Sequence, residues 1–235
     1  MARGLRIFET DPDARPKEYV RDTVGRFRSG RMEGRRPVAL DQWRVTTGDP
    51  KVASAIAEMY GGTAEEWDTE SEDSLEVLTD AESVEVIIAN ADAITSDLKL
   101  WGMNGAIIHH CDGVEFLDEE RRGHPCGCPA LLADRKALAR AGQGPKPDTR
   151  AKFRIAQAPE LGVFEMRSGS WDLVRVLHQI QNRLDDVNGP ALCTLTLDTV
   201  SFVPKGGPRK GQTVSYKVPT ITVHGAAPAQ DAPAA

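Results

Sequence analysis

Three cysteines and three histidines lie within twenty residues of one another, and their side chains are well suited to bind a metal ion. They are His109, His110, Cys111, His124, Cys126 and Cys128. Thiolate and imidazole are the ligands that zinc prefers in structural sites, where four of them surround the ion tetrahedrally. Prolines at 125 and 129 flank the Cys-Gly-Cys pair and restrict its backbone. The sequence therefore predicts a structural zinc site in this segment.

The fourth ligand beside Cys111, Cys126 and Cys128 has to be chosen among the histidines. Side chains two residues apart in a β-strand share a face. His109 and Cys111 can therefore point together, whereas His110 points away. We predict His109 as the fourth ligand, with His124, two residues before Cys126, as its main competitor and His110 as the remaining alternative.

A group of unconnected loop thiols is the alternative interpretation, because Cys-x-Cys is a tighter spacing than the usual Cys-x-x-Cys. A disulfide is disfavoured in a reducing compartment. If zinc binds, four protein ligands close the site and make it structural, since a catalytic zinc keeps an open position. Cys193 lies outside this group in an apolar stretch and is interpreted as a core residue.

Motifs of the common enzyme classes are absent from the sequence. There is no Walker loop, no Gly-x-Gly-x-x-Gly and no Gly-x-Ser-x-Gly. The segment from His124 to Pro129 lacks both the His-x-Glu and the Pro-Cys-x-x-Cys of the zinc deaminases. We therefore expect no enzymatic activity.

The elements that must position the cysteines follow from hydrophobic periodicity and from capping residues. Helices are predicted over 50–60, 129–140 and 171–187, the first capped by Asp49 and the last by Ser170. Strands are predicted around 75–77 and 84–86 with a turn at 80–83, on both sides of Asp112-Gly113, at 153–155 and 163–165, at 192–198, and at 213–225 with a break at Pro219; 142–148 is predicted to be a loop. Hairpins with a few packed helices indicate an α+β fold.

Three regions are distinguished by composition. Residues 1–36 are predicted to be an extended basic arm with one short strand. Residues 37–224 form the α+β body, which includes a small zinc-stabilised hairpin and loop module at 105–130. Residues 225–235, rich in Ala and Pro, are predicted to be a disordered tail.

Charge excludes some functions and suggests separate surfaces. With 235 residues, of which 40% are hydrophobic, the chain can bury a core, and a net charge of −6 excludes a strongly basic nucleic-acid wrapper. The local balance is +4 over 1–36, −12 over 49–99 and +4 over 201–224. Such asymmetry suggests distinct surfaces for distinct partners.

No apolar run is long enough for a membrane span, and the N-terminus does not look like a signal peptide. We expect a soluble protein that stays inside the cell.

Several segments resemble one protein family. They are GLRIFETDPDARP, VGRFRSG, PVALDQWRVTTGDP, HHCDGVEF, HPCGCP and LGVFEMRSGSW. Together they resemble the recombination directionality factors of actinobacterial phages, which are partners of large serine integrases. The resemblance covers most of residues 4–224. Some members have a further cysteine near the position of 144–147, which this chain lacks, and His109 takes its place in the predicted ligand set.

The resemblance implies a protein without chemistry of its own. Such a factor binds the integrase, by expectation on its coiled-coil motif, and reaches attachment-site DNA mainly through it. It favours prophage excision (attL × attR) and opposes integration (attP × attB) in the cytoplasm of an infected or lysogenic bacterium. The main alternative is a zinc-stabilised phage replication or single-strand-DNA-binding accessory protein, which would need an aromatic-lined basic groove. A hydrolase that uses the Cys/His group is a third possibility.

Overall fold

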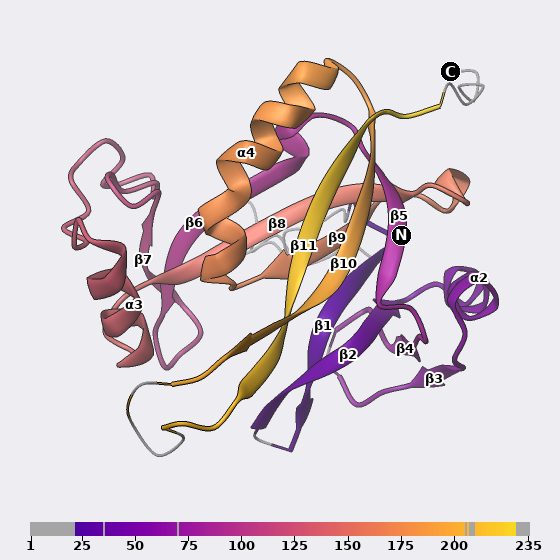
Figure 1. The fold of residues 1–235 in the computed structure, drawn as a ribbon, viewed down its shortest axis with the longest axis horizontal. Coiled ribbons are helices and arrows are strands. Elements are labelled where there is room, and N and C mark those ends of the chain that lie inside the picture. Colours follow the sequence, from indigo (N-terminus) through magenta and orange to yellow (C-terminus); the bar gives the residue numbers. More distant parts are fainter. Residues whose placement is uncertain (1–21, 35, 70, 205, 207–209, 229–235) are drawn as a thin grey trace, which may run out of the picture.

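The computed structural model describes residues 22–228 except 35, 70, 205 and 207–209, and in these a mixed sheet dominates (Figure 1). Its strands are β1 (Gly25–Glu33), β2 (Arg36–Thr47), β3 (Ala64–Glu66), β4 (Leu75–Leu78), β5 (Ser83–Ile88), β6 (Ile94–Trp101), β7 (Ile107–Cys111), β8 (Lys146–Ile155), β9 (Phe164–Ser168), β10 (Ala191–Phe202) and β11 (Val214–Ala226). The helices are α2 (Pro50–Tyr60), α3 (Leu132–Arg140) and α4 (Trp171–Val187), with short 3-10 turns η2 (Ala91–Ala93) and η3 (Pro159–Leu161). The predicted α+β class is confirmed.

Strand β8 joins two parts of the sheet. One edge of β8 pairs with β9, and the other pairs first with β6 and then, at its end, with β5. The order β11-β10-β5-β8-β9-β1-β2-β4-β3 follows from this, with β6 and β7 as a side branch. The β1–β9 pair is parallel, and the other pairs between strands are antiparallel.

Aromatic side chains form the centre of the main core. The ring of Phe27 meets those of Trp43, Phe153 and Phe164 edge-on, with centroid separations of 5.9, 5.3 and 5.5 Å. Helix α4 contributes its buried residues to the same core: Leu173, Leu177, Ile180 and Leu184. Cys193, predicted to be a core residue, is fully buried in the same cluster.

Two helices begin and end where their capping residues predict. Asp49 accepts a hydrogen bond from the Lys51 amide and starts α2, which ends at Gly61 with φ of 77°. The Ser170 hydroxyl accepts from two amides of the first turn of α4, and this helix ends at Asn188 in the left-handed conformation. Side-chain acceptors at N-caps and left-handed residues at C-termini are local features, so sequence alone locates them.

The predicted pairing at 75–86 is wrong. Both strands exist, but β4 pairs with β2 and β3, whereas β5 pairs with β8 and β10. The chain between them therefore passes from one part of the sheet to the other, and Val77 of β4 and Val84 of β5 both contribute to the main core.

Two further boundaries differ from the prediction. The segment predicted as a loop at 142–148 contains the start of β8, because Lys146–Asp148 pair with β6. Helix α3 begins at Leu132 rather than at Pro129. The start of β8 has no local signal, because it depends on β6, a strand distant in sequence.

Pro219 does not break β11. It lies opposite Leu197, whose amide donates to the Glu82 carbonyl on the far side of β10. Leu197 and Pro219 are therefore a non-hydrogen-bonded pair, and the missing amide of Pro219 points to the open edge of the sheet. An edge strand accommodates proline at such a position without losing a hydrogen bond.

The predicted basic arm is partly in the sheet. Of residues 1–36, the structure describes 22–34 and 36, and Gly25–Glu33 form a strand that pairs with both β2 and β9. At the other end, Gly225 and Ala226 of the predicted tail belong to β11. Residues 1–21 and 229–235 lie outside the described residues.

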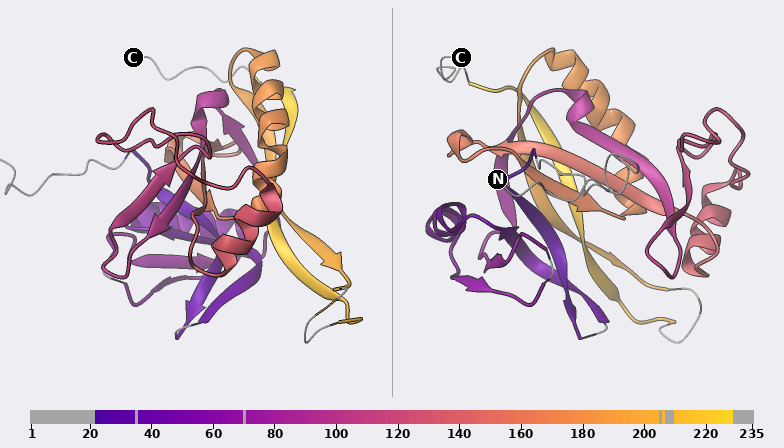
Figure 2. Two further views of the ribbon diagram at one scale, coloured as in Figure 1. Left: turned by 90° about the vertical axis from the view of Figure 1, so that its left-hand side faces the viewer. Right: turned by 180° about the vertical axis from the view of Figure 1, so that it is seen from behind.

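The distal ends of β10 and β11 form a hairpin that extends away from the body, as two views of the ribbon show (Figures 1 and 2). Among the described residues, none of the helices has the length and apolar character that a membrane crossing requires.

Candidate metal centre

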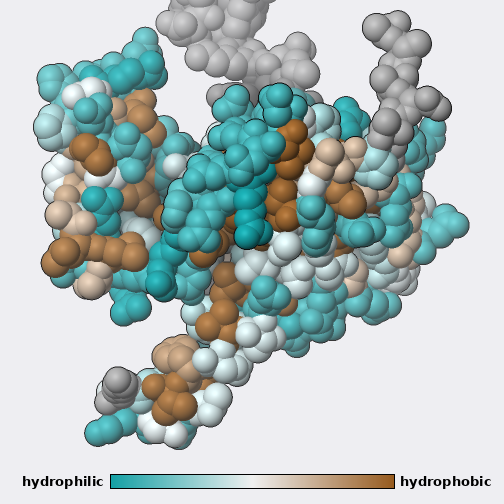
Figure 3. Space-filling view, turned by 45° about the horizontal axis from the view of Figure 1, so that its top comes forward, coloured by the Kyte–Doolittle hydropathy of each residue, from teal (hydrophilic) through white to brown (hydrophobic). Residues whose placement is uncertain are grey.

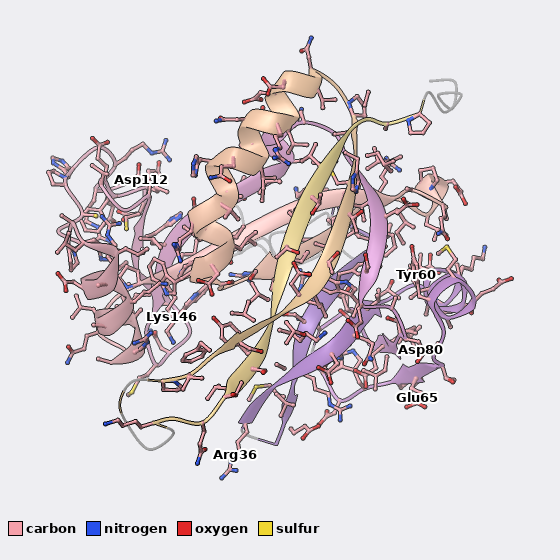
Figure 4. The ribbon with its side chains drawn as sticks, viewed as in Figure 1. Arg36, Tyr60, Glu65, Asp80, Asp112 and Lys146 are labelled. Carbon is pink, nitrogen blue, oxygen red and sulfur yellow. The ribbon has the colours of Figure 1, made fainter. Side chains whose placement is uncertain are left out.

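Strand β7, the loops that follow it and helix α3 lie together at one side of the molecule (Figure 1). Residues 105–130 of this region are called the Cys/His module below. The β6–β7 hairpin supplies the first two cluster residues, with His109 opposite Leu100 and Cys111 opposite Leu98. Figure 4 shows the sulfur atoms of this region beside the labelled Asp112.

Four side chains of the module converge. The Nε2 atom of His109 lies 3.2 Å from Cys111 Sγ and 3.5 Å from Cys128 Sγ, and the two sulfurs are 3.8 Å apart. With Cys126, all four potential ligand atoms lie within 4.8 Å of one another. Sulfurs bound at ~2.3 Å to one tetrahedral zinc ion would be about 3.8 Å apart. All three cysteines are free thiols, and the group can hold a metal ion.

The other two histidines of the sequence group are placed elsewhere. His110 lies on the opposite face of β7, where its Nε2 is 3.0 Å from Asp97 Oδ2. His124 is exposed, and the cluster does not include it. The structure thus brings together His109 and the three cysteines, and the alternation of side chains in a strand accounts for the choice of His109 over His110.

A turn directly after Cys111 brings the second pair of cysteines to the first. Asp112 Oδ1 accepts hydrogen bonds from the amides of Val114 and Glu115, and Cys111 pairs with Phe116 across this turn. The Cys126 amide then donates to the Val114 carbonyl. The Asp-Gly signal correctly predicts a reversal here, but the prediction of a strand after Gly113 is wrong: the described residues between Cys111 and α3 form isolated β-bridges, and Cys111 with Phe116 is the bridge across the four-residue turn.

Arg135 of helix α3 fixes both loops that carry cysteines, and sequence reasoning missed it. Its guanidinium donates to the Gly113 carbonyl (2.8 Å) and to the Pro129 carbonyl (2.5 Å). Gly113 has φ of 101°, and a Cβ there would lie 2.3 Å from Arg135 Nη1. The arginine thus needs a glycine beside it. An arginine on a polar helix gives no sequence signal for such a contact.

Apolar side chains pack against the cysteines of the cluster. Leu98, Cys111 and Cys126 form a small core separate from the main one, with Phe116, Cys128 and Trp171 packed against it. The centroids of the Phe116 and His109 rings are 4.9 Å apart. The Arg121 guanidinium carbon lies over the Phe116 ring, 3.9 Å from its centroid.

Burial determines the protonation of the metal-free cluster. It raises the pKa of the Cys111 thiol, an effect opposed by the hydrogen bond with the Gly113 backbone and increased by the nearby Cys128. Burial also raises the pKa of Cys128 and lowers the pKa of His109. The thiols of Cys111 and Cys128 are therefore neutral without a cation, and a metal ion that binds them must displace their protons.

The model of one protein family matches residues 24–224, which contain every helix and nearly every strand described above, and the Cys/His module. No solved structure matches the chain. Because the match covers far more than half of the chain, the protein belongs to the Gp3-like family, whose members are described as recombination directionality factor-like.

Proposed function

We propose that this protein is a recombination directionality factor that binds a large serine integrase and switches it from integration to prophage excision. The family match over residues 24–224 carries this proposal. The protein would act in the bacterial cytoplasm by binding alone, without cutting or joining DNA. A regulator of this kind must bind one integrase assembly more tightly than another, because only differential affinity shifts an equilibrium.

We further propose that the Cys/His module holds one structural zinc ion. His109, Cys111, Cys126 and Cys128 supply the nitrogen and sulfur ligands that zinc prefers, at separations that fit a tetrahedron. Four protein ligands leave no open position for substrate. When bound, the ion supplies a rigid cross-link between β7 and the Cys-Gly-Cys loop.

Elemental analysis tests the zinc proposal. The purified protein should contain one zinc per chain, and Cys126→Ser should lose the metal and melt at a lower temperature, because structural zinc contributes folding free energy directly. Cys193→Ser is the matched control, since it replaces a buried cysteine outside the cluster and should keep the metal. A metal-free protein of undiminished stability in strong chelator would contradict the zinc proposal.

Recombination in vitro tests the functional proposal. With the cognate integrase, the protein should stimulate attL × attR recombination and suppress attP × attB recombination. It should also bind the integrase, and deletion of the integrase coiled coil should abolish that binding. The proposal fails if neither reaction changes direction, and binding of single-stranded DNA in the absence of integrase would indicate a replication accessory protein instead.

A further inference from the structure

A cavity of about 400 Å³ lies where α3 approaches the start of α4. The described residues that line it belong to α3, the end of β9, the start of α4, β11 and β1. In Figure 1, the lower end of α4, where the helix begins, lies between α3 and β11. Small-molecule sites in proteins measure roughly 300–1,000 Å³. We call this space the α3–α4 cavity; it is large enough for a small ligand, and none of the four side chains of the Cys/His cluster lines it.

The lining of the α3–α4 cavity carries more positive than negative charge. The described residues that line it include three cations and one carboxylate: Lys136, Arg140, Lys217 and Asp172. Lys217 is already paired, because its Nζ lies 3.1 Å from Glu82 Oε2, outside the lining. The two cations that remain are four residues apart on α3, so they lie on the same side of that helix.

The carboxylate of Asp172 does not neutralise both cations of α3. Its Oδ1 is 4.0 Å from Lys136 Nζ, at the limit of an ion pair, and its Oδ2 accepts a hydrogen bond from the Tyr216 hydroxyl (2.9 Å). Arg140 forms no ion pair with any residue that the structure describes. The guanidinium of Arg140 therefore keeps its hydrogen-bond donors for a ligand in the cavity.

Two hydroxyl groups add donors from the sheet. Ser168 is only 7% exposed, and its oxygen accepts from the Ser170 amide (3.1 Å), but no described residue accepts the Ser168 proton. Ser29 lies at the register shift of β1 and makes no side-chain hydrogen bond within the described part of the chain. Because a buried donor without an acceptor costs free energy, these hydroxyls favour a ligand that is rich in acceptors.

We propose that the α3–α4 cavity binds a phosphate group. A phosphate presents negatively charged acceptor oxygens in a tetrahedral arrangement, so donors can reach it from several elements at once. Arg140 and Lys136 donate from α3, and the hydroxyls of Ser29 and Ser168 donate from the sheet. A carboxylate has two oxygens in one plane and satisfies fewer of these donors. The phosphate comes either from a free phosphate ion or from the backbone of a nucleic acid, and the experiment distinguishes the two sources.

Two substitutions in the lining test the site. Arg140→Gln removes an exposed cation, and Ser168→Ala removes the buried hydroxyl. The matched control is Arg183→Gln, an exposed position of α4 outside the lining. The exposed surface of α4 is hydrophilic, as Figure 3 shows, so a glutamine is well accommodated there. Circular dichroism verifies that all three variants fold, which matters most for Ser168→Ala because it also removes the acceptor of the Ser170 amide.

Binding of inorganic phosphate is measured by titration calorimetry and by the rise in melting temperature. Chloride at equal ionic strength is the reference, because phosphate also stabilises proteins without a site. Arg140→Gln should bind phosphate about tenfold more weakly than wild type, and Ser168→Ala about threefold more weakly. Arg183→Gln should bind it as wild type does, and acetate should bind wild type more weakly than phosphate does.

A short DNA duplex at low salt identifies the source of the phosphate. If Arg140→Gln weakens duplex binding and Arg183→Gln does not, the nucleic-acid backbone supplies the group. If only the binding of inorganic phosphate depends on Arg140, a free phosphate ion occupies the cavity.

Three results would overturn the proposal: no binding of either probe to wild type, full retention of binding in Arg140→Gln and Ser168→Ala, or equal affinity for acetate and phosphate. These assays contain no integrase, so such a result leaves the proposed function untouched, and failure of the recombination assay leaves the phosphate site untouched.

Discussion

At the scale of single residues, Asp148 is a buried carboxylate that the sheet stabilises with cationic side chains. This carboxylate on β8 is buried and accepts hydrogen bonds from Lys99, Arg150 and Arg167. Burial alone would raise the pKa of Asp148. The hydrogen bonds from Arg167 and Lys99, with the charges of Arg167 and Arg150, outweigh burial and lower the pKa from 3.8 to about 2.

Stability should therefore depend on the ionisation of Asp148. A pKa depressed in the folded state contributes stability that is complete above pH ~4 and is lost as the pH falls toward 2. Asp148→Asn should lower the free energy of unfolding at pH 7 by about 2 kcal/mol and flatten its decline between pH 4 and 2. Urea titrations at pH 7 and between pH 4 and 2 measure the free energy of unfolding and its decline, with a substitution of an exposed carboxylate, Asp41→Asn, as control. An unchanged acid profile in Asp148→Asn would show that the ion pairs contribute nothing.

Gly113 should be intolerant of any side chain. Gly113→Ala forces a left-handed alanine against the Arg135 guanidinium, so the change should destabilise the protein by about 2 kcal/mol or more. Gly127→Ala has a similar φ, 72°, but meets nothing within 4 Å, and should cost about 1 kcal/mol. Chemical denaturation compares the two. Equal costs would show that the contact with Arg135 is immaterial.

The residue types of the cluster could be predicted from sequence, but the residues that support it could not. Cysteines and histidines close together in the sequence indicate a group that can hold a metal ion, and the alternation of side chains in a strand separates His109 from His110. Arg135 acts through two backbone carbonyls, which any sequence provides. Its role depends on where α3 packs, and no local pattern encodes that.

At the scale of elements, the cap of α4 offers a direct test. The Ser170 hydroxyl accepts from the Asp172 and Leu173 amides, which otherwise lack a partner within the helix. Ser170→Ala should lower the free energy of unfolding by about 1 kcal/mol. Ser54→Ala, in the exposed middle of α2, should change it by less than about 0.5 kcal/mol. Equal effects of the two substitutions in thermal or urea unfolding would argue against capping.

Helices were more predictable than strand partners for a physical reason. The bounds of α2 and α4 depend on residues within one turn of each end, such as Asp49 and Asn188. The pairing of β4 and the start of β8 depend on strands far away in the sequence. Turn residues between two strands therefore predict that the chain reverses, but not which strand it pairs with next.

At the scale of the whole molecule, the two cores predict two levels of stability. The core around Cys111 and Cys126 is small and separate from the main core between the strands and α4. Metal removal should loosen the Cys/His module first. Hydrogen exchange in chelator should accelerate at 107–135 while β10 and α4 stay protected. Uniform acceleration throughout the chain would indicate one cooperative unit instead.

The parallel pairing of β1 with β9 has a consequence for how the protein is made. Gly25 pairs with Phe164, so the β1–β2 hairpin leaves the ribosome long before its inner neighbour is translated. At roughly 5–20 residues per second, Phe27 and Trp43 wait on the order of ten seconds without the strand that buries them. Nascent chains arrested before Phe164 should be cut by protease within 25–47, and chains arrested well beyond α4 should resist. If both nascent chains resist the protease equally, the β1–β2 hairpin is protected without β9. If only the longer chain resists, a segment that is translated early is among the last to be protected.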